Sequence, residues 1–309
     1  MTLKSSINKS HISYLKKTIQ LSKLVFTPLA ITFLIIIAWQ NHTTIMQIYS
    51  HAQKNMLIIA IISWSLLYLL YPVMLITLIK HWNTPLSFKH ALYIFINRLP
   101  ARYIPGGIWQ TVARFSDFRQ HGLNNRQLTG LLLLENFLAL GLALLIGGII
   151  LLQFQQSDIW WWLTITGILG GIIITLGSLA LTNRYILPKE HRIDTPTFTR
   201  VLLIMLTYWL LAASIFVLYV NSLPNISGDQ HIVRLGGVYL FSWSIGNLAF
   251  FAPQGIGVFE VVSSELLQGN LGLKETIALL AGFRVIIILA DFLAWTCLKG
   301  AFFLRKAFK

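Results

Sequence analysis

The chain has 309 residues, of which 56% are hydrophobic and only 11% are charged, and its mean hydropathy is +0.70. An ordinary soluble domain carries about 25% charged residues, so the composition excludes that class and predicts an all-α polytopic membrane protein. The formal net charge of +14 resembles that of a nucleic-acid binder, but the basic residues lie between apolar runs and at the two ends. This spread is typical of cytoplasmic loops beside anionic lipid, so no nucleic-acid partner is expected.

Two membrane spans are predicted near the amino terminus. A basic segment, residues 1–23, precedes an apolar run at Leu24–Gln40, so the positive-inside rule places the amino terminus in the cytoplasm. A second span is expected at Met56–Ile79. Pro72 within it predicts a kink, because proline lacks the N–H that would bond to the carbonyl four residues earlier.

The next segment is predicted to enter the membrane without crossing it. The run Leu86–Leu99 has too few apolar residues for a span, and a second short arm follows at Ile108–Phe118. The helix breakers Pro105, Gly106 and Gly107 lie between the two arms. A broken helix survives in hydrocarbon only when it is packed in protein or lines a wet cavity. We therefore expect a re-entrant helical hairpin that enters from the cytoplasm.

Three full spans follow this first hairpin. They are expected at Leu128–Leu152, at Trp160–Leu181 and at Val201–Val220. The loop Gln153–Asp158 has no basic residue and should lie outside, whereas the linker Thr182–Arg200 is basic and should be cytoplasmic.

A second re-entrant hairpin is predicted before the last span. Its arms are expected at Val233–Phe251 and Ile256–Leu267, and it should enter from the outside. The last span is expected at Glu275–Leu298, and the basic tail 299–309 should be cytoplasmic.

The predicted fold is thus all-α, with six full spans and two re-entrant helical hairpins in an inverted repeat. The repeats are residues 24–152 and 159–298, and each has an odd number of crossings, so the halves are upside down relative to each other. Pro105 and Pro253 are 148 residues apart, as are Gly107 and Gly255. Paired breaks at matching positions of two halves are typical of the binding site of a transporter.

Four charged residues are expected within the apolar segments, namely Glu135, Glu260, Arg284 and Asp291. A lone charge at the bilayer centre costs roughly 2.5–3.5 kcal/mol on insertion scales, so each needs a partner or water. At the repeat spacing Glu135 falls opposite Arg284, and we expect an ion pair between them. Three interpretations of these charges remain open: locking helices together, handling a substrate or coupling ion, and snorkelling to the interface.

Two arginines flank the first break. Arg102 and Arg114 could bind a phosphate that arrives from the cytoplasmic leaflet, since a guanidinium binds phosphate with two hydrogen bonds. The alternative is ordinary positive-inside anchoring, with Tyr103 and Gln110 only packing the hairpin. The candidate substrate-binding residues are Arg102, Tyr103, Pro105, Gly106, Gly107, Gln110, Arg114, Glu135, Pro253, Gly255, Gly257, Glu260, Arg284 and Asp291.

The sequence has no catalytic or metal-binding pattern. The histidines are scattered, the single Cys297 lies in an apolar segment, and no metalloprotease, hydrolase or Walker motif is present. The polar ends are too short to hold a catalytic domain. We therefore expect no enzyme activity, no cofactor and no metal. Small-residue spacings such as Gly167 and Gly171 predict close helix packing rather than a ligand site.

The two broken motifs together resemble the lysylphosphatidylglycerol synthase transmembrane-region family, which includes the flippase portion of the multiple peptide resistance factor. The resemblance is carried by Arg102-Tyr103-Ile104-Pro105-Gly106-Gly107 with Gln110 and Arg114, by His121-Gly122-Leu123, by Leu134-Glu135, and by Pro253-Gln254-Gly255-Ile256-Gly257-Val258-Phe259-Glu260 with Arg284. It covers roughly residue 24 to the end of the chain. Gln254 departs from the usual Pro-Gly-Gly.

This resemblance implies a membrane body that moves or holds a lipid with a polar headgroup. The leading hypothesis is a stand-alone lipid translocase of a cell membrane, the bacterial inner or plasma membrane, that handles a phospholipid or a polyprenyl-phosphate-linked lipid. The alternative is a non-transporting accessory that recruits a glycosyltransferase or another lipid-modifying enzyme. A third hypothesis, an intramembrane lipid phosphatase-like enzyme, lacks an acid, base and metal set. Homo-oligomerisation, the identity of the lipid, and the direction and energy source of transport are left open.

Overall fold

The computed structural model describes residue 39 and residues 42–84, 86–103, 109–154, 158–227, 231–249, 255–267 and 271–307. Within these ranges all the regular elements are helices. Five helical segments are long and apolar enough to cross a membrane: Lys54–His81, Asn125–Leu152, Ile159–Ile186, Thr195–Asn221 and Lys274–Ala301. They coincide with the five spans predicted from Met56 onward, so the chain is an all-helical, multi-pass membrane protein. The predicted first span, Leu24–Gln40, lies outside the described residues apart from Trp39.

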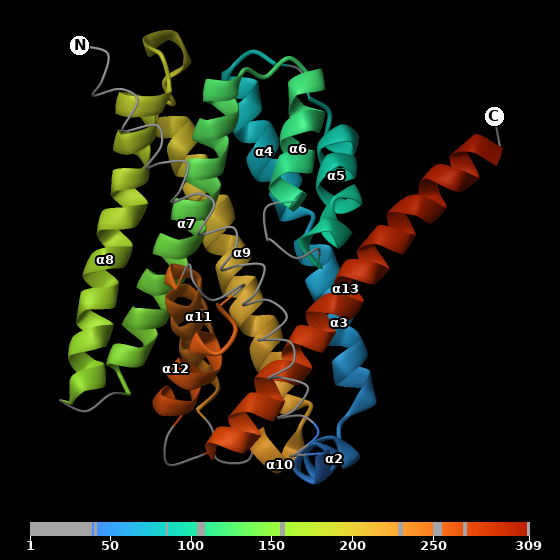
Figure 1. The fold of residues 1–309 in the computed structure, drawn as a ribbon, viewed down its shortest axis with the longest axis vertical. Helices are drawn as coiled ribbons and strands as arrows, with labels where there is room; N and C mark the ends of the chain where they lie inside the picture. The colour runs from blue at the N-terminus through green and yellow to red at the C-terminus, as the bar shows by residue number, and fades with distance from the viewer. Residues whose placement is uncertain are drawn as a thin grey trace, which may run out of the picture.

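In chain order the helices are α2 (His42–Ser50), α3 (Lys54–Leu67), α4 (Leu70–His81), α5 (Phe88–Asn97), the 3-10 helix η1 (Leu99–Tyr103), α6 (Trp109–Gln120), α7 (Asn125–Leu152), α8 (Ile159–Leu181), the π-helical turn η2 (Thr182–Ile186), η3 (Lys189–His191), α9 (Thr195–Asn221), α10 (Pro224–Ser227), α11 (Ile232–Leu248), α12 (Val258–Leu266) and α13 (Leu273–Ala307). The long helices α7, α8 and α9 run roughly along the long axis of the molecule, and α13 crosses it at an incline (Figure 1).

The second predicted span is interrupted at its middle. Tyr68 and Leu69 separate α3 from α4, and the Leu69 N–H bonds to the Leu66 carbonyl at 2.9 Å in a tightened turn. Pro72 lies four residues after Tyr68 and cannot donate to the Tyr68 carbonyl. The break expected from Pro72 is therefore confirmed at this place.

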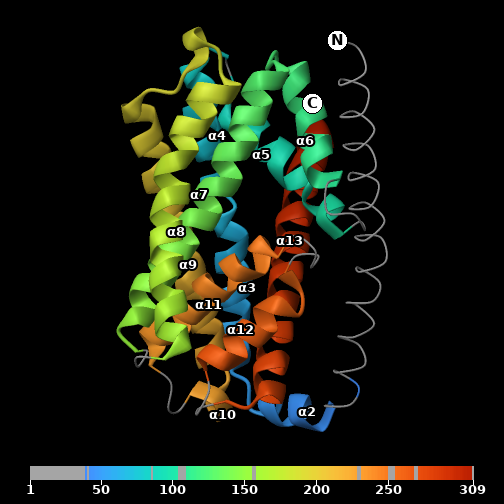
Figure 2. The ribbon, with the colours of Figure 1, turned by 60° about the vertical axis from the view of Figure 1, so that its left-hand side comes forward.

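The two pairs of short helices lie at opposite ends of the molecule. Figures 1 and 2 show α5 and α6 at one end, beside the end of α4 and the start of α7, and α11 and α12 toward the other end, near α2 and α10. The residues that link the short helices, 104–108 and 250–254, lie outside the described part of the chain. The predicted breakers Pro105, Gly106, Gly107 and Pro253 are among them, whereas Gly255 is described.

The same set of helix contacts occurs twice along the chain. α7 begins at Asn125 and α13 begins 148 residues later at Leu273. α5 packs on α4, α6 and α13, and α11 packs correspondingly on α9, α12 and α7. α13 also packs on α3 as α7 packs on α9, while α3 and α9 contact each other. Each half therefore builds the same neighbourhood from helices at matching places in the sequence.

Glycines allow the long helices to approach closely. A Cβ on Gly171 of α8 would lie 2.8 Å from the Gly141 carbonyl oxygen of α7, and one on Gly167 would lie 2.5 Å from the Phe241 ring of α11. A Cβ on Gly147 of α7 would lie 2.6 Å from the Phe241 backbone nitrogen. The predicted role of Gly167 and Gly171 in helix packing is confirmed.

Candidate functional site

A cavity of about 350 Å³ lies where α4, α5, α6, α7, α9 and α11 meet. Its apolar wall includes Leu70, Phe95, Leu140, Met205, Trp209 and Trp243. Its polar groups are Tyr68, Tyr71, Arg102, Gln110, Arg114, Glu135, Asn136, Tyr208 and Asn247. An apolar cavity with a few convergent polar groups is the usual form of a small-ligand site.

Arg114 and Glu135 form an ion pair on the cavity wall. Arg114 Nη2 lies 3.1 Å from Glu135 Oε1 and 3.2 Å from Oε2, so α6 is joined to α7. The Tyr71 hydroxyl of α4 donates to Glu135 Oε2 and accepts from Arg114 Nη1. The guanidinium carbon also lies 5.1 Å from the centre of the Tyr71 ring, which stacks on Phe95 with ring centroids 3.9 Å apart. Three helices thus fix one charged pair by hydrogen bonds and a cation–π contact.

A second ion pair joins the cavity residue Arg102 of η1 to α13. Arg102 Nη1 lies 3.1 Å from Asp291 Oδ2 of α13, and the Tyr103 hydroxyl donates to the same oxygen at 2.7 Å. The Tyr68 hydroxyl donates to Asp291 Oδ1, and Trp64 Nε1 donates to the Tyr68 oxygen at 2.9 Å. Asp291 is only 2% exposed and has three partners, which fits a charge held within the protein.

The third ion pair joins the short helix α12 to α13. Arg284 Nη2 of α13 lies 2.9 Å from Glu260 Oε1 of α12. The other carboxylate oxygen of Glu260 accepts from the Gly257 N–H at 2.7 Å, so Glu260 also caps the start of α12. Gly257 has a φ of +90°, which glycine adopts without strain. Gly255, with a φ of +70°, is in close backbone contact with Gly246, since a Cβ there would lie 2.8 Å from the Gly246 Cα.

The predicted ion pair between Glu135 and Arg284 is wrong. Glu135 pairs with Arg114 and Arg284 pairs with Glu260. Equivalent positions of the two halves face equivalent surroundings, so each of these residues contacts the preceding short helix of its own half, α6 for α7 and α12 for α13. The repeat spacing identifies Glu135 and Arg284 as equivalent positions in the two halves. Equivalent positions need not be in contact with each other.

The two pairs occupy matching places with their charges exchanged. Glu135 and Arg284 are 149 residues apart, and Arg114 and Glu260 are 146 apart, close to the 148-residue spacing of α7 and α13. In the first half the short helix carries the arginine and the long helix carries the glutamate. In the second half the order is reversed. In each half, one charged pair therefore joins a short helix to the long helix that follows it.

The structure gathers some of the predicted residues and leaves others apart. Four of them, Arg102, Gln110, Arg114 and Glu135, line the cavity. The described residues that do not line it are Tyr103, Gly255, Gly257, Glu260, Arg284 and Asp291. Tyr103 and Asp291 still contact the cavity residue Arg102 or its partners, whereas Glu260 and Arg284 form the separate pair at α12.

Several functional groups of the site were not identified from the sequence. Tyr68 and Tyr71 bond directly to the charged residues, and Trp209 and Trp243 form a ring pair with centroids 4.3 Å apart in the cavity wall. Single aromatic residues in apolar spans usually pack, so the sequence alone offers no signal that separates these from packing residues.

One further ion pair fixes the first pair of short helices. Arg98, at the end of α5, donates to both carboxylate oxygens of Asp117 in α6, with both distances 2.7 Å. This two-point contact holds the arms together. The sequence does carry a signal for this pair, because one predicted arm has a basic residue and the other has an acidic one.

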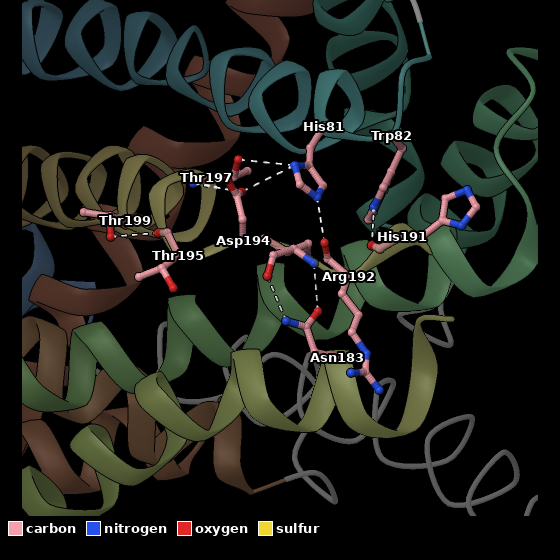
Figure 3. A network of polar contacts seen from close by, with 10 residues as sticks. His81, Trp82, Asn183, His191, Arg192, Asp194, Thr195, Thr197 and Thr199 are labelled. Atoms are coloured by element: carbon pink, nitrogen blue, oxygen red, sulfur yellow. Dashed lines mark hydrogen bonds and ion pairs between the residues drawn. The ribbon is translucent and has the colours of Figure 1, made fainter. Parts of the chain in front are cut away.

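A polar network outside the cavity joins α4 to the connection between α8 and α9 (Figure 3). His81 Nε2 bonds to the Arg192 carbonyl at 2.7 Å, and Trp82 Nε1 donates to the His191 carbonyl at 2.8 Å. Asp194 caps α9 by accepting from the Thr197 N–H at 3.2 Å, and it lies 3.4 Å from His81 Nδ1. Hydrogen bonds from Thr197 lower the pKa of Asp194 below its usual value. The network fixes this face of the molecule and includes no cavity residue.

The described residues contain no group of three side chains suited to a metal ion. No model of a known protein family matches the chain, and no curated protein matches it. The family resemblance therefore stays a prediction that depends on the two sequence motifs.

Proposed function

We propose that the chain is an integral membrane lipid translocase that handles a phospholipid or a polyprenyl-phosphate-linked lipid in a cell (inner or plasma) membrane. The observation that carries the proposal is the cavity with the ion pair of Arg114 and Glu135 in its wall, inside a largely apolar helical body. Charged groups at membrane depth are costly, and they are typical of a pathway for a polar group. The resemblance to the lysylphosphatidylglycerol synthase transmembrane-region family points to the same kind of ligand.

The proposed architecture is six crossings with two re-entrant hairpins in an inverted repeat. It is supported by the positions of α5–α6 and α11–α12 at opposite ends and by the recurring helix contacts. An inverted repeat gives an alternating-access mechanism, because exchanging the conformations of the halves reverses the side on which the cavity opens.

The proposed orientation places the α5–α6 end in the cytoplasm. At that end the connection between α8 and α9 carries Arg184, Lys189 and Arg192. The segments 153–158 and 222–231, predicted to lie outside, contain no lysine or arginine. Basic connections face the cytoplasm in most multi-pass proteins. The first hairpin then enters from the cytoplasm and the second from the outside.

Arg114 is the proposed contact for the lipid phosphate. Its partner Glu135 has a side chain 18% exposed, whereas Asp291, the partner of Arg102, has one only 3% exposed. A phosphate can therefore replace Glu135 on the guanidinium, with Tyr71 beside both groups. The released Glu135 would then accept a cation of the headgroup or a proton. Arg102, held by Asp291 and tyrosines, has a mainly structural role in this mechanism.

The test is a leaflet assay in liposomes with phosphatidylglycerol labelled on one chain. The protein should accelerate movement of the label between leaflets, and Arg114→Gln should slow it about tenfold, since a hydrogen bond to a charged group contributes about 1.5–3 kcal/mol. Arg119→Gln is the matched control, because Arg119 is exposed on the same helix and lies outside the cavity.

Asn136→Phe provides a second variant that leaves the ion pair in place. Asn136 is an exposed cavity residue whose amide bonds within its own helix, so a phenylalanine should fill the cavity without breaking the fold. Slow movement in this variant would support a route through the cavity. If phosphatidylglycerol and a polyprenyl phosphate each move between leaflets at the same rate with and without wild-type protein, the proposal is contradicted. A lipid-modifying enzyme that co-purifies with an inactive protein would instead favour the accessory role.

A further inference from the structure

A groove of about 530 Å³ lies on the membrane-facing side of the bundle, between the α3–α4 junction and the second half of α9. Leu67 and Ile215 form its floor and are 3% and 7% exposed. Leu66, Leu69 and Leu211 form its rim and are 58%, 39% and 45% exposed. The groove is therefore lined mainly by apolar side chains and opens on a surface that contacts hydrocarbon.

The groove and the cavity are neighbours that share a wall. Leu70 lines both of them, and the interrupted segment at Tyr68–Leu69 separates them. Tyr68 and Tyr71 face the cavity from this segment, while Leu66 and Leu69 face the groove. The helix is interrupted here next to Pro72. The side chains of this short segment are polar on the side of the cavity and apolar on the side of the groove.

The direction of the groove follows from the order of its residues on α9. The cavity residues of α9 are Ile204, Met205, Tyr208 and Trp209. The groove residues Leu211, Ser214, Ile215 and Leu218 follow them. α9 runs toward the end of the molecule that holds α10 (Figure 1). The groove therefore extends from the level of the cavity toward that end. Along α3 and α4 it spans Ser63 to Leu70, about 10 Å at 1.5 Å per residue.

We infer that one hydrocarbon chain of the transported lipid lies in this groove while its phosphate-bearing headgroup occupies the cavity. This rests on the proposed function. It gives the bound lipid the orientation of the leaflet at the α5–α6 end, because the chain points from the headgroup toward the α10 end, and that leaflet is cytoplasmic in the proposed orientation. Lipid tails are as apolar as leucine, so the groove alone gives little affinity for one lipid over another. Selective occupancy must therefore come from the headgroup in the adjoining cavity.

Photocrosslinking tests this directly. The probe is phosphatidylglycerol with a diazirine on one chain, in phosphatidylcholine vesicles, and the labelled residues are mapped by mass spectrometry. Groove residues of α3 and α9 should be labelled at least fivefold more than the exposed stretch of α9 around Thr207, and Asn136→Phe should remove this excess. Equal labelling of the two stretches, or labelling that Asn136→Phe leaves unchanged, would mean ordinary boundary lipid and would overturn the inference. Crosslinking of two protein chains through this face would make it an interface between copies, with the same consequence.

A matched pair of variants on α9 gives an independent test. Ser214 lies in the groove and its hydroxyl bonds to the Leu210 carbonyl at 2.8 Å. Thr207, two turns earlier, is also exposed, bonds to the Leu203 carbonyl at 2.9 Å and lines neither the groove nor the cavity. Ser214→Trp should slow lipid movement at least fivefold, and Thr207→Trp should leave it within twofold of wild type.

The outcomes separate the two proposals. If wild-type protein moves lipid and Ser214→Trp moves it equally well, the chain position is wrong while the translocase stands. If wild-type protein moves no lipid but the groove is labelled in a way that depends on the cavity, the translocase is wrong while the lipid site stands.

Discussion

Arg114 and Glu135 are the residues on which the site depends, because each satisfies the other within an apolar body. Removing one member of a buried ion pair leaves an uncompensated charge and typically costs about 3–5 kcal/mol, whereas removing both costs less. We expect Arg114→Gln and Glu135→Gln each to lower the thermal stability of the detergent-solubilised protein. The double variant should be more stable than the sum of the two effects predicts.

The control for this cycle is Glu135→Gln combined with Arg284→Gln. These residues belong to different pairs, so their effects should add. Additivity between Arg114 and Glu135, or strong coupling between Glu135 and Arg284, would contradict the pairing.

Asp194 gives a prediction on pH that is separate from the cavity. Its pKa is lowered by hydrogen bonds from Thr197, so the folded state binds the proton more weakly than the unfolded state. The Asp194 carboxylate therefore makes its whole contribution to stability at pH values well above 4. This contribution is lost as the pH falls through the lowered pKa. The melting temperature of Asp194→Asn should lie below that of its parent at pH 6, and the gap should close toward pH 3. Both proteins should carry His81→Gln, which removes the neighbouring imidazole, and a gap independent of pH would contradict the prediction.

For single residues, the sequence identifies the charged groups of the site more reliably than it identifies the partner of each group. Glu135 and Arg114 are conspicuous because charge within apolar segments is rare and costly. Their pairing depends on the rotation and depth of α6 against α7, which no local pattern encodes. Tyr68 and Tyr71 were missed because a tyrosine in a span looks the same whether its hydroxyl binds a carboxylate or reaches the interface.

At the level of the elements, α7 packs on both α8 and α11. Gly147 allows the close approach to α11, where an added Cβ would lie 2.6 Å from a backbone nitrogen. We expect Gly147→Ala to lower stability by about 1–3 kcal/mol, the usual cost of overpacking. Gly177→Ala in α8 is the matched control, since nothing lies within 4 Å of its added Cβ.

The control should instead gain up to about 1 kcal/mol, because alanine favours a helix over glycine. Thermal unfolding of both variants in detergent measures the contrast. Equal effects of the two substitutions would show that α7 and α11 are not in close contact at Gly147.

The helices themselves were largely predictable. The five spans from Met56 onward follow from length and hydropathy, and the α3–α4 interruption follows from Pro72. Local signals also fix some starts: Asn124 and Gln127 form a reciprocal cap at the start of α7. The packing of α5 on α13 and of α11 on α7 was not predictable, because it joins segments far apart in sequence through shape rather than through a motif.

For the whole molecule, the proposed mechanism depends on the claim that the two hairpins enter the membrane from opposite faces. α5 and α6 lie at one end, and α11 and α12 lie toward the other (Figures 1 and 2). Alternating access through one cavity depends on this arrangement, because hairpins on the same side could not exchange roles.

Cysteine labelling with a membrane-impermeant thiol reagent tests this claim most directly. In a background with Cys297→Ser, single cysteines replace the exposed Gln120, at the end of α6, and His231, before α11. The account predicts that Gln120→Cys reacts only in inside-out vesicles and His231→Cys only in right-side-out vesicles. Reaction of both cysteines from the same face would contradict it.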